Sequence, residues 1–468
     1  MHVVAAVALA TFVVAAWRLT RPDFAERFVP PATPEDLGRI RVLVGVILLA
    51  SAVWEDLPRS ALMPRALILP MGVLQFLYKA HVGFDRLVAS VAGLTVFKWV
   101  TAAALLAATL GWRTRVSVPV AAALILVYHG ILRQYFFFNH AGLVAILVLI
   151  VLSFTPCGDA WSLDRRRRER QGLLVAPAGV GTWRYGWARY ACWTLLAVLY
   201  VEAGLSKIRN GGWFWWDPTN LRYIYYRCTL DPMNFGWRLA IDVGRAPDAV
   251  FAAFGIFSIL AEVAYGSVLV SRLARRVMPL VMVAFHLAVW VFQNLLFLDL
   301  ILLQAIFVTP RARATATQRA GVGGPLLVAA IAAVLLGCYA KRVEWYPLTS
   351  MQMFSGRHRT PVVDYYKLVA HHADCSAAPA DLSHCRFRWA ATVMLLKRAF
   401  DPARRAPLEE FLAGCAAGWN ESAPPARAWR TLEVQRWRWN FGAQPADPDL
   451  GAIADRWVMT VAEDGVHQ

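Results

Sequence analysis

The chain has 468 residues, of which 58% are hydrophobic, and a formal net charge of +17. Soluble globular domains average about 45–50% apolar residues, so this composition excludes an ordinary soluble protein. The charge does not indicate a nucleic-acid partner, because residues 356–468 carry 14 basic and 13 acidic residues. The remaining excess lies in short loops between apolar runs, which is typical of the cytoplasmic side of a multi-pass membrane protein.

Ten apolar runs are predicted to form membrane spans, and several exceed the roughly 17 residues needed to cross a bilayer. No basic segment precedes the first run, so we expect a transmembrane helix there rather than a cleaved signal peptide. Residues 277–309 are barely long enough for two full crossings. One of the two runs, 277–293 or 295–309, is therefore expected to be a half-span or a re-entrant segment. The predicted spans are residues 1–17, 40–54, 87–110, 115–135, 138–155, 185–207, 247–271, 277–293, 295–309 and 324–341.

The arginines predict an orientation for these spans. With ten spans, all the basic loops fall on one side, which the positive-inside rule makes cytoplasmic. We therefore expect both termini to be extracytoplasmic, in a multi-pass protein of the cell inner membrane. The Arg- and Ala-rich composition suggests a bacterial source. The basic loops are residues 18–41, 111–115, 156–184, 272–276 and 310–323.

Two longer segments face outward in this arrangement. Residues 55–86 contain three prolines and are expected to lie at the membrane interface. Residues 208–246 are rich in Trp, Tyr and Pro and are too polar to span. We expect the second segment to cap a site at the outer end of the bundle.

The character of the chain changes after Lys341. We predict a transmembrane domain over residues 1–342, a hinge over 343–355 and an extracytoplasmic domain over 356–468. The fold class is thus an all-α polytopic membrane bundle of about 8–10 transmembrane helices, followed by a small extracytoplasmic α+β or β-sandwich domain. Alternating and aromatic patterns predict strands over 362–370, 387–396 and 430–441, with a helix over 408–417.

Seven cysteines occur, none of them in a CxxC pair. This pattern gives no sign of a structural metal site, and no metal is predicted. Cys375 and Cys385 can form a disulfide if the external compartment is oxidising.

The chemistry of the chain centres on Lys207, near the end of the span 185–207. Ionisable residues in a membrane span are costly and mark functional sites. The predicted topology places Asn139 and His140 at the same depth as Lys207. An apolar pocket disfavours the charged form of a lysine, which can then act as a general base, and a nearby histidine can stabilise a developing anion.

Structural alternatives stay open for each of these residues. Lys207 can simply extend to the interface, and His140 can be a satisfied helix-end residue. His286 lies mid-span and is either structural or lines a cavity. Lys98, central in its own span, is a rival to Lys207. Glu262 is expected to pair with a buried cation, for which Lys98 and His286 are candidates.

Three ordered segments resemble the vitamin K-dependent γ-carboxylase-like membrane proteins, also called the HTTM family. The first is Phe138-Asn-His-Ala-Gly-Leu143, followed by Trp161-Ser-Leu-Asp164. The second is Ala203-Gly-Leu-Ser-Lys207-Ile, with Trp213 shortly after. The third is Glu262, then a basic loop, then Phe285-His286. The resemblance covers roughly residues 40–310.

The resemblance implies a set of roles. Lys207 would deprotonate reduced vitamin K, either menaquinol or phylloquinol. Reaction with O2 would give an epoxide and a strong base, which removes a glutamate γ-proton before CO2 adds. His140 would stabilise the carbanion. The further candidates for the pocket are Asn139, His286, Glu262, Glu202 and Trp213.

Two features depart from the carboxylases. Ser206 stands where they have a second lysine, and the external domain is much shorter than theirs. We predict a carboxylase-like enzyme whose partners are the bilayer, a quinol and a glutamate-containing peptide or protein, without nucleic acid. The alternative is a non-catalytic membrane protein that binds lipid or quinone and presents its external domain to a partner. A transporter is a third class, but the sequence has no inverted repeat to support it.

Overall fold

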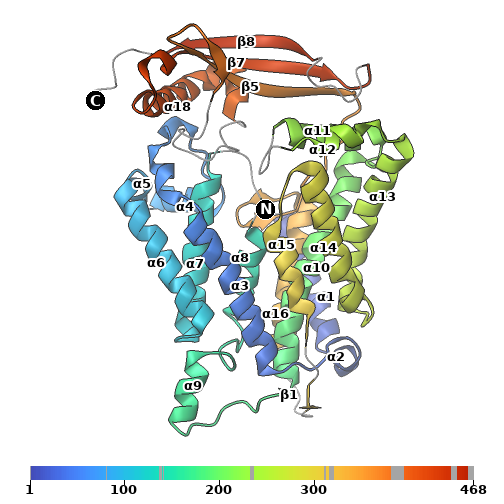
Figure 1. Ribbon diagram of the computed structural model, residues 1–468. Coiled ribbons are helices and arrows are strands. Elements are labelled where there is room, and N and C mark those ends of the chain that lie inside the picture. Colours follow the sequence, from blue (N-terminus) through green and yellow to red (C-terminus); the bar gives the residue numbers. More distant parts are fainter. Residues whose placement is uncertain are drawn as a thin grey trace.

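A helical bundle carries a β-sheet domain at one end (Figure 1). The computed structural model describes residues 2–80, 82–135, 140, 142–231, 237–309, 312–315, 321–380, 395–443 and 451–461.

In the described part of the chain, seven helices are long and apolar enough to cross a membrane by length and composition. They are α3 (Pro34–Trp54), α6 (Val91–Leu110), α7 (Thr114–Arg133), α10 (Trp183–Gly211), α13 (Asp248–Ala264) with η4 (Tyr265–Leu269), α14 (Ala274–Gln293) and α16 (Gly323–Lys341). These helices confirm the multi-pass helical fold class.

The other three predicted spans also contain helices. Residues 1–17 fall in the 18-residue helix α1 (His2–Leu19), and the described part of 138–155 contains the 10-residue helix α8 (Leu143–Leu152). Residues 295–309 contain α15 (Leu298–Leu303) and η5 (Gln304–Phe307), which agrees with the expected half-span. The predicted run 40–54 belongs to a longer helix of 21 residues. It starts earlier because Thr33 and Asp36 form a capping box ahead of the apolar run.

α10 is the central helix of the bundle. Of the seven spans it is the most enclosed, with 78% of its 18-residue apolar window buried. It packs against α16 on one side and α13 on another. α10 therefore contacts α16 and α13 through different faces.

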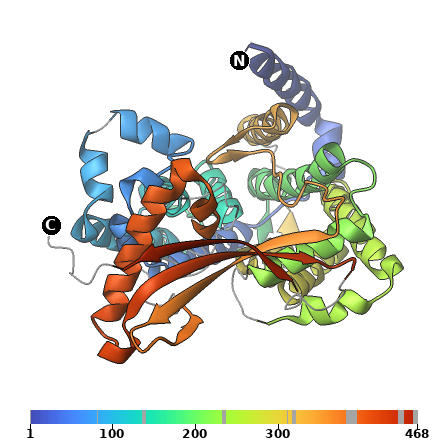
Figure 2. The same cartoon turned by 90° about the horizontal axis from the view of Figure 1, so that it is seen from above.

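The C-terminal domain has an α+β fold, and its described strands form a single sheet. The order is β6 (Ala377–Pro379), β5 (Val362–His372), β7 (Trp429–Asn440) and β8 (Ala452–Thr460), with every pair antiparallel. α18 (Pro402–Asn420) packs under one end, and α11 (Pro218–Leu230) lies under the other (Figures 1 and 2). Tyr226 of α11 contacts Trp439 and Phe441 of the domain.

Several predictions for this domain need correction. Of the predicted strand 387–396, residues 387–394 lie outside the described residues, and the chain continues as the 3-10 helix η7 (Leu396–Phe400). The predicted helix begins earlier, because Asp401 caps it at Pro402. β6 and β8 were not predicted: β6 has only 3 residues, and Asp455-Arg456 interrupts the apolar pattern of β8.

The possible disulfide between Cys375 and Cys385 does not form. Cys375 is a free, exposed thiol, and the disulfide-bonded cysteine of the described domain is Cys415. Cys385 lies outside the described residues.

The hinge contains a small hairpin. Its strands are β3 (Glu344–Trp345) and β4 (Leu348–Thr349). The chain then runs over residues 350–355 before entering the sheet domain, and this run contributes to the site described below.

Candidate functional site

The central feature of the site is an ion pair between α10 and α13. Lys207 Nζ lies 2.8 Å and 2.6 Å from the two carboxylate oxygens of Glu262. The two side chains are 5% and 7% exposed, so Lys207 does not extend to the interface. Glu262 does have a buried cation as its partner, but the cation is Lys207 rather than Lys98 or His286.

Gly204 allows the two helices to approach at this point. A Cβ added to Gly204 would lie 2.8 Å from Cγ2 of Val263 and 3.1 Å from Cβ of Glu262. The glycine lies three residues before Lys207, about one helical turn away. The Ala-Gly-x-x-Lys spacing thus brings the lysine against the helix that carries its carboxylate.

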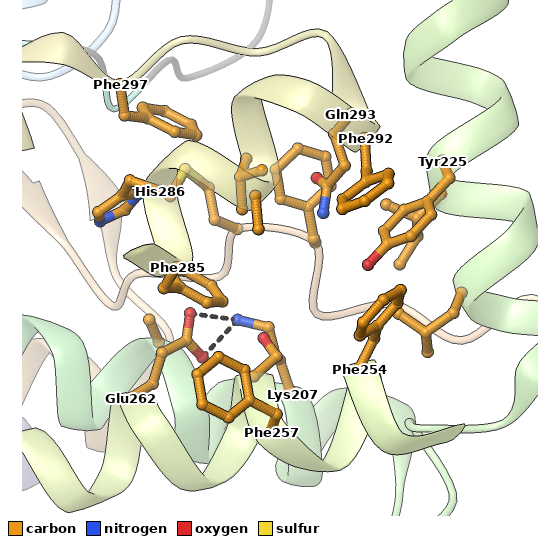
Figure 3. A pocket seen from close by; sticks show the side chains of 18 of the residues that line it. Lys207, Tyr225, Phe254, Phe257, Glu262, Phe285, His286, Phe292, Gln293 and Phe297 are labelled. Atoms are coloured by element: carbon orange, nitrogen blue, oxygen red, sulfur yellow. Dashed lines mark hydrogen bonds and ion pairs between the residues drawn. The ribbon is translucent and has the colours of Figure 1, made fainter. Parts of the chain in front are cut away.

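The ion pair faces an apolar pocket (Figure 3). α11, α13 and α14 supply most of its walls, and the pair lies between the rings of Phe257 and Phe285. The aromatic residues lining the pocket include Tyr225, Phe254, Phe257, Phe285, Phe292 and Phe297. A flat hydrophobic ring would find stacking partners on several sides.

One face of α10 meets this pocket. Tyr200, Ala203 and Lys207 all line it, and their spacing of three and seven residues places them on one face of a helix. Glu202, which was expected in the pocket, is not among its described lining residues and is fully buried. Among the described residues, neither of its carboxylate oxygens has a hydrogen-bond partner.

His286 forms a second polar group in the pocket wall. Its Nε2 lies 2.8 Å from the hydroxyl of Tyr200. The amide of Gln304 donates to that hydroxyl at 3.2 Å and accepts from Tyr265 at 2.6 Å. Within the described structure, Nδ1 of His286 is buried without a partner. The histidine is therefore held by one nitrogen and keeps the other available.

Trp215, not Trp213, lines the pocket. Trp213 is 77% exposed, whereas Trp215 is buried and its indole donates to the carbonyl of Phe354 at 2.8 Å. Lys207 Nζ lies 5.4 Å from the centroid of its ring, within the range of a cation–π contact.

The hinge also reaches the pocket. Met351, Met353 and Phe354 are among its lining residues. Sequence reasoning missed them because they follow the last span and lie more than 140 positions after Lys207 in the chain.

His140 occupies a neighbouring position outside this lining. Its Nε2 lies 2.9 Å from Thr349 Oγ1 and 3.7 Å from a carboxylate oxygen of Glu344. The next residue along, Ser350, accepts a hydrogen bond from Ser206 at 3.0 Å. Segment 349–351 thus contacts His140, α10 and the pocket in succession. Asn139 lies outside the described residues.

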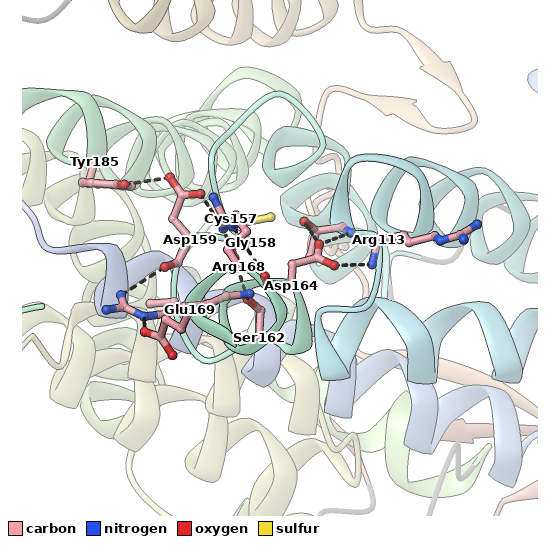
Figure 4. A network of polar contacts seen from close by, with 12 residues as sticks. Arg113, Cys157, Gly158, Asp159, Ser162, Asp164, Arg168, Glu169 and Tyr185 are labelled. Atoms are coloured by element: carbon pink, nitrogen blue, oxygen red, sulfur yellow. Dashed lines mark hydrogen bonds and ion pairs between the residues drawn. The ribbon is translucent and has the colours of Figure 1, made fainter. Parts of the chain in front are cut away.

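Two other candidates have structural contacts. Lys98 donates to the backbone carbonyl of Glu55 at 2.8 Å, beyond the end of α3. Asp164, in α9 (Leu163–Arg170), accepts from the amides of Arg113 and Thr114, both at 2.7 Å (Figure 4). Ser162 caps α9 by accepting from Arg165 at 2.9 Å. The Ser-Leu-Asp motif therefore fastens α9 to the start of α7.

The site can hold an apolar ring and transfer a proton. Glu262 can take the proton of Lys207, which leaves a neutral amine towards the pocket. Among the described residues, no group of three or more His, Cys, Asp or Glu side chains is arranged to hold a metal ion.

Comparison with known protein families gives a match. A family model described as the HTTM domain matches residues 30–310, more than half of the chain. No curated protein and no solved structure matches the chain.

Proposed function

Since the chain belongs to the HTTM domain family, we propose that it binds a reduced quinone of the vitamin K class in the aromatic pocket and deprotonates it. The observation that carries the proposal is the buried Lys207–Glu262 pair facing a wall of aromatic rings. A buried acid–base pair in an apolar cavity is an expensive arrangement, and such arrangements are typical of functional sites.

The chain supplies the proton transfer. Transfer of the ammonium proton of Lys207 to Glu262 leaves an uncharged pair, which suits the low dielectric of the pocket better than two separate charges. The amine then accepts a proton from a quinol hydroxyl. The resulting quinolate oxygen lies beside a newly charged ammonium, which stabilises it.

His286 suits the second oxygen of a quinol. The hydroxyl of Tyr200 is hydrogen-bonded to Nε2 of His286. Nδ1 of His286 has no partner in the described part of the structure. A 1,4-dihydroxylated ring has polar groups at two opposite positions, and the pocket has polar groups from α10 and α14. Binding at both ends would orient the ring relative to Lys207.

The carboxylation step is the finer part of the proposal. A bound quinol with O2 supplies the strong base, and CO2 supplies the carboxyl group. A glutamate-containing peptide would approach from the end that carries the β-sheet, which we place outside the membrane. His140 would act beside segment 349–351, where Thr349 and Glu344 hold it.

The test is epoxide formation by the purified protein in lipid nanodiscs. Menaquinol and phylloquinol are supplied with O2, and the epoxide is measured by chromatography. We expect wild type to form epoxide, and Lys207→Ala and Glu262→Gln to lose most of it, at least about 100-fold. Lys98→Ala and Glu202→Gln serve as matched controls, because both residues lie in apolar spans outside the pocket lining.

Two results would overturn the proposal. Epoxide formation that survives in Lys207→Ala would remove the base from its role. Quinol binding without any epoxide from wild type would favour the non-catalytic alternative, in which the pocket only holds a lipid or quinone.

A further inference from the structure

A second pocket lies where the bundle meets the C-terminal domain. It is lined from residues 60–89 together with Tyr135. Met63 and Tyr135 of its wall belong to the same hydrophobic cluster as Leu396 and Phe411 of the domain. This pocket shares no lining residue with the one around Lys207.

The floor of this pocket is a fixed chain of hydrogen bonds. Tyr78 donates to the side-chain oxygen of Gln134 at 2.9 Å, and the amide of Gln134 donates to Tyr135 at 3.0 Å. Tyr135 in turn donates to the carbonyl of Ser60 at 2.7 Å. Gln134 and Tyr135 are fully buried. The floor is therefore rigid, and its donors are already committed.

One buried hydroxyl in this pocket wall has no hydrogen-bond partner in the described structure. Ser60 is 1% exposed, and its Oγ has no hydrogen-bond partner among the described residues. A buried polar atom without a partner costs free energy, so a native site usually supplies one from water or a ligand. Since Ser60 lines the pocket, the missing partner can come from the cavity.

Two opposite charges line this pocket. Arg65 and Asp85 both line the pocket and are exposed. In the part of the chain that the structure describes, neither forms an ion pair. Both act on the same phenol: burial raises the pKa of Tyr78 to about 12, with Asp85 raising it further and Arg65 opposing this. The pocket lining therefore carries one charge of each sign.

We propose that this pocket binds a small zwitterion, with its anionic group on Arg65 and its ammonium on Asp85. Ser60 would donate to the anionic group, and the apolar wall formed by Met63, Ile68 and Val88 would take a hydrophobic portion. Opposite charges without partners select a ligand that carries both signs, because an ion of one sign would leave the other charge repelling it. Such chemistry occurs in free α-amino acids and in the phosphoethanolamine headgroup of lipids.

The experiment is isothermal titration calorimetry of the full-length protein, with L-leucine in one arm and glycerophosphoethanolamine in the other. We expect at least one probe to bind, and binding to weaken by at least about tenfold in both Arg65→Gln and Asp85→Asn. The matched controls are Arg59→Gln and Asp56→Asn, which break a nearby surface ion pair of 2.7 Å. Thermal unfolding of each variant verifies that it folds.

The probe whose binding gives a heat signal shows whether the zwitterion is a free amino acid or a lipid headgroup. Binding should persist in Lys207→Ala, because the proposal does not depend on the quinol site. Absence of binding by both probes would overturn it, as would equal affinity in all four variants. Weakening by Arg65→Gln but not by Asp85→Asn would also overturn it, since the site would then recognise an anion only.

Discussion

Gly204 of α10 faces Glu262 of α13 so closely that a Cβ on the glycine would lie 3.1 Å from Cβ of the glutamate. Gly204→Val should therefore separate the two helices and move Glu262 away from Lys207. We expect a loss of about 1–3 kcal/mol in stability from overpacking, together with reduced epoxide formation. Thermal unfolding and the epoxide assay measure the two effects.

The control for this variant is Gly414→Ala. Among the described residues, nothing lies within 4 Å of a Cβ added to Gly414, and alanine favours a helix by about 1 kcal/mol over glycine. This change should leave the unfolding temperature equal or slightly higher. If Gly204→Val behaves in the same way, the close approach of α10 and α13 is not needed for the ion pair.

The losses of stability caused by substitutions at Lys207 and at Glu262 should be strongly coupled. Lys207→Met or Glu262→Leu alone leaves an uncompensated buried charge, which typically costs about 3–5 kcal/mol. The double variant removes both charges and should recover most of that loss, while remaining inactive. A double-mutant cycle by thermal unfolding measures the coupling. Additive losses would show that the two charges do not depend on each other.

The two tryptophans beyond α10 should differ. Trp215→Phe removes the hydrogen bond to Phe354 and part of the pocket wall. We expect a loss of about 0.5–1.5 kcal/mol in quinol affinity, or roughly two- to tenfold. Trp213→Phe should leave affinity unchanged because the side chain is 77% exposed. Quinol titration followed by tryptophan fluorescence compares the two, and a larger effect from Trp213 would contradict the assignment.

Docking of the C-terminal domain should depend on pH. His358 stacks on Tyr223 of α11, with ring centroids 3.5 Å apart. Burial, and then the nearby Arg227, lower its pKa from 6.5. The unfolded chain then binds the proton more readily, so stability falls as the pH drops below about 6.5. Unfolding temperatures between pH 7.5 and 5 should decrease in wild type, and less steeply in His358→Phe. Equal slopes would assign the pH dependence to another group.

Asp164 should affect folding rather than chemistry. Asp164→Ala removes the acceptor for the amides of Arg113 and Thr114, at a cost of about 1–3 kcal/mol. The rate of epoxide formation per folded molecule should stay unchanged. A selective loss of rate at full stability would instead place the Ser-Leu-Asp motif in the reaction.

Sequence patterns predicted the spans well, because crossing a bilayer requires a long apolar run regardless of which helices pack beside it. Lys207 and Glu262 could be singled out by the same logic, since ionisable residues in such runs are costly. Their pairing could not be predicted, because it depends on which helices pack together and on the missing side chain of Gly204. The short spans α8 and α15 show the opposite limit: their apolar composition was visible, but not where each helix ends.

His140 and Lys207 were predicted to lie at the same depth in the membrane, but this did not place both in the lining of one pocket. His140 was expected beside Lys207, yet its described contacts are with Thr349 and Glu344. Those residues belong to the hinge, and no local pattern reveals that it folds back against α10. The choice between Trp213 and Trp215 likewise depends on the turn at Gly212, whose φ is +78°, and on Gly211, where a Cβ would lie 2.4 Å from the ring of Trp215.

α11 contributes to two surfaces at once. Its Ile224 and Tyr225 line the pocket, while the next residue, Tyr226, packs against Trp439 and Phe441 of the sheet domain. A preparation of the helical part alone would expose this second side to water and leave one wall of the pocket unsupported. The pocket and the sheet therefore share one helix as a common wall, and we expect binding at the C-terminal domain to change the shape of the pocket.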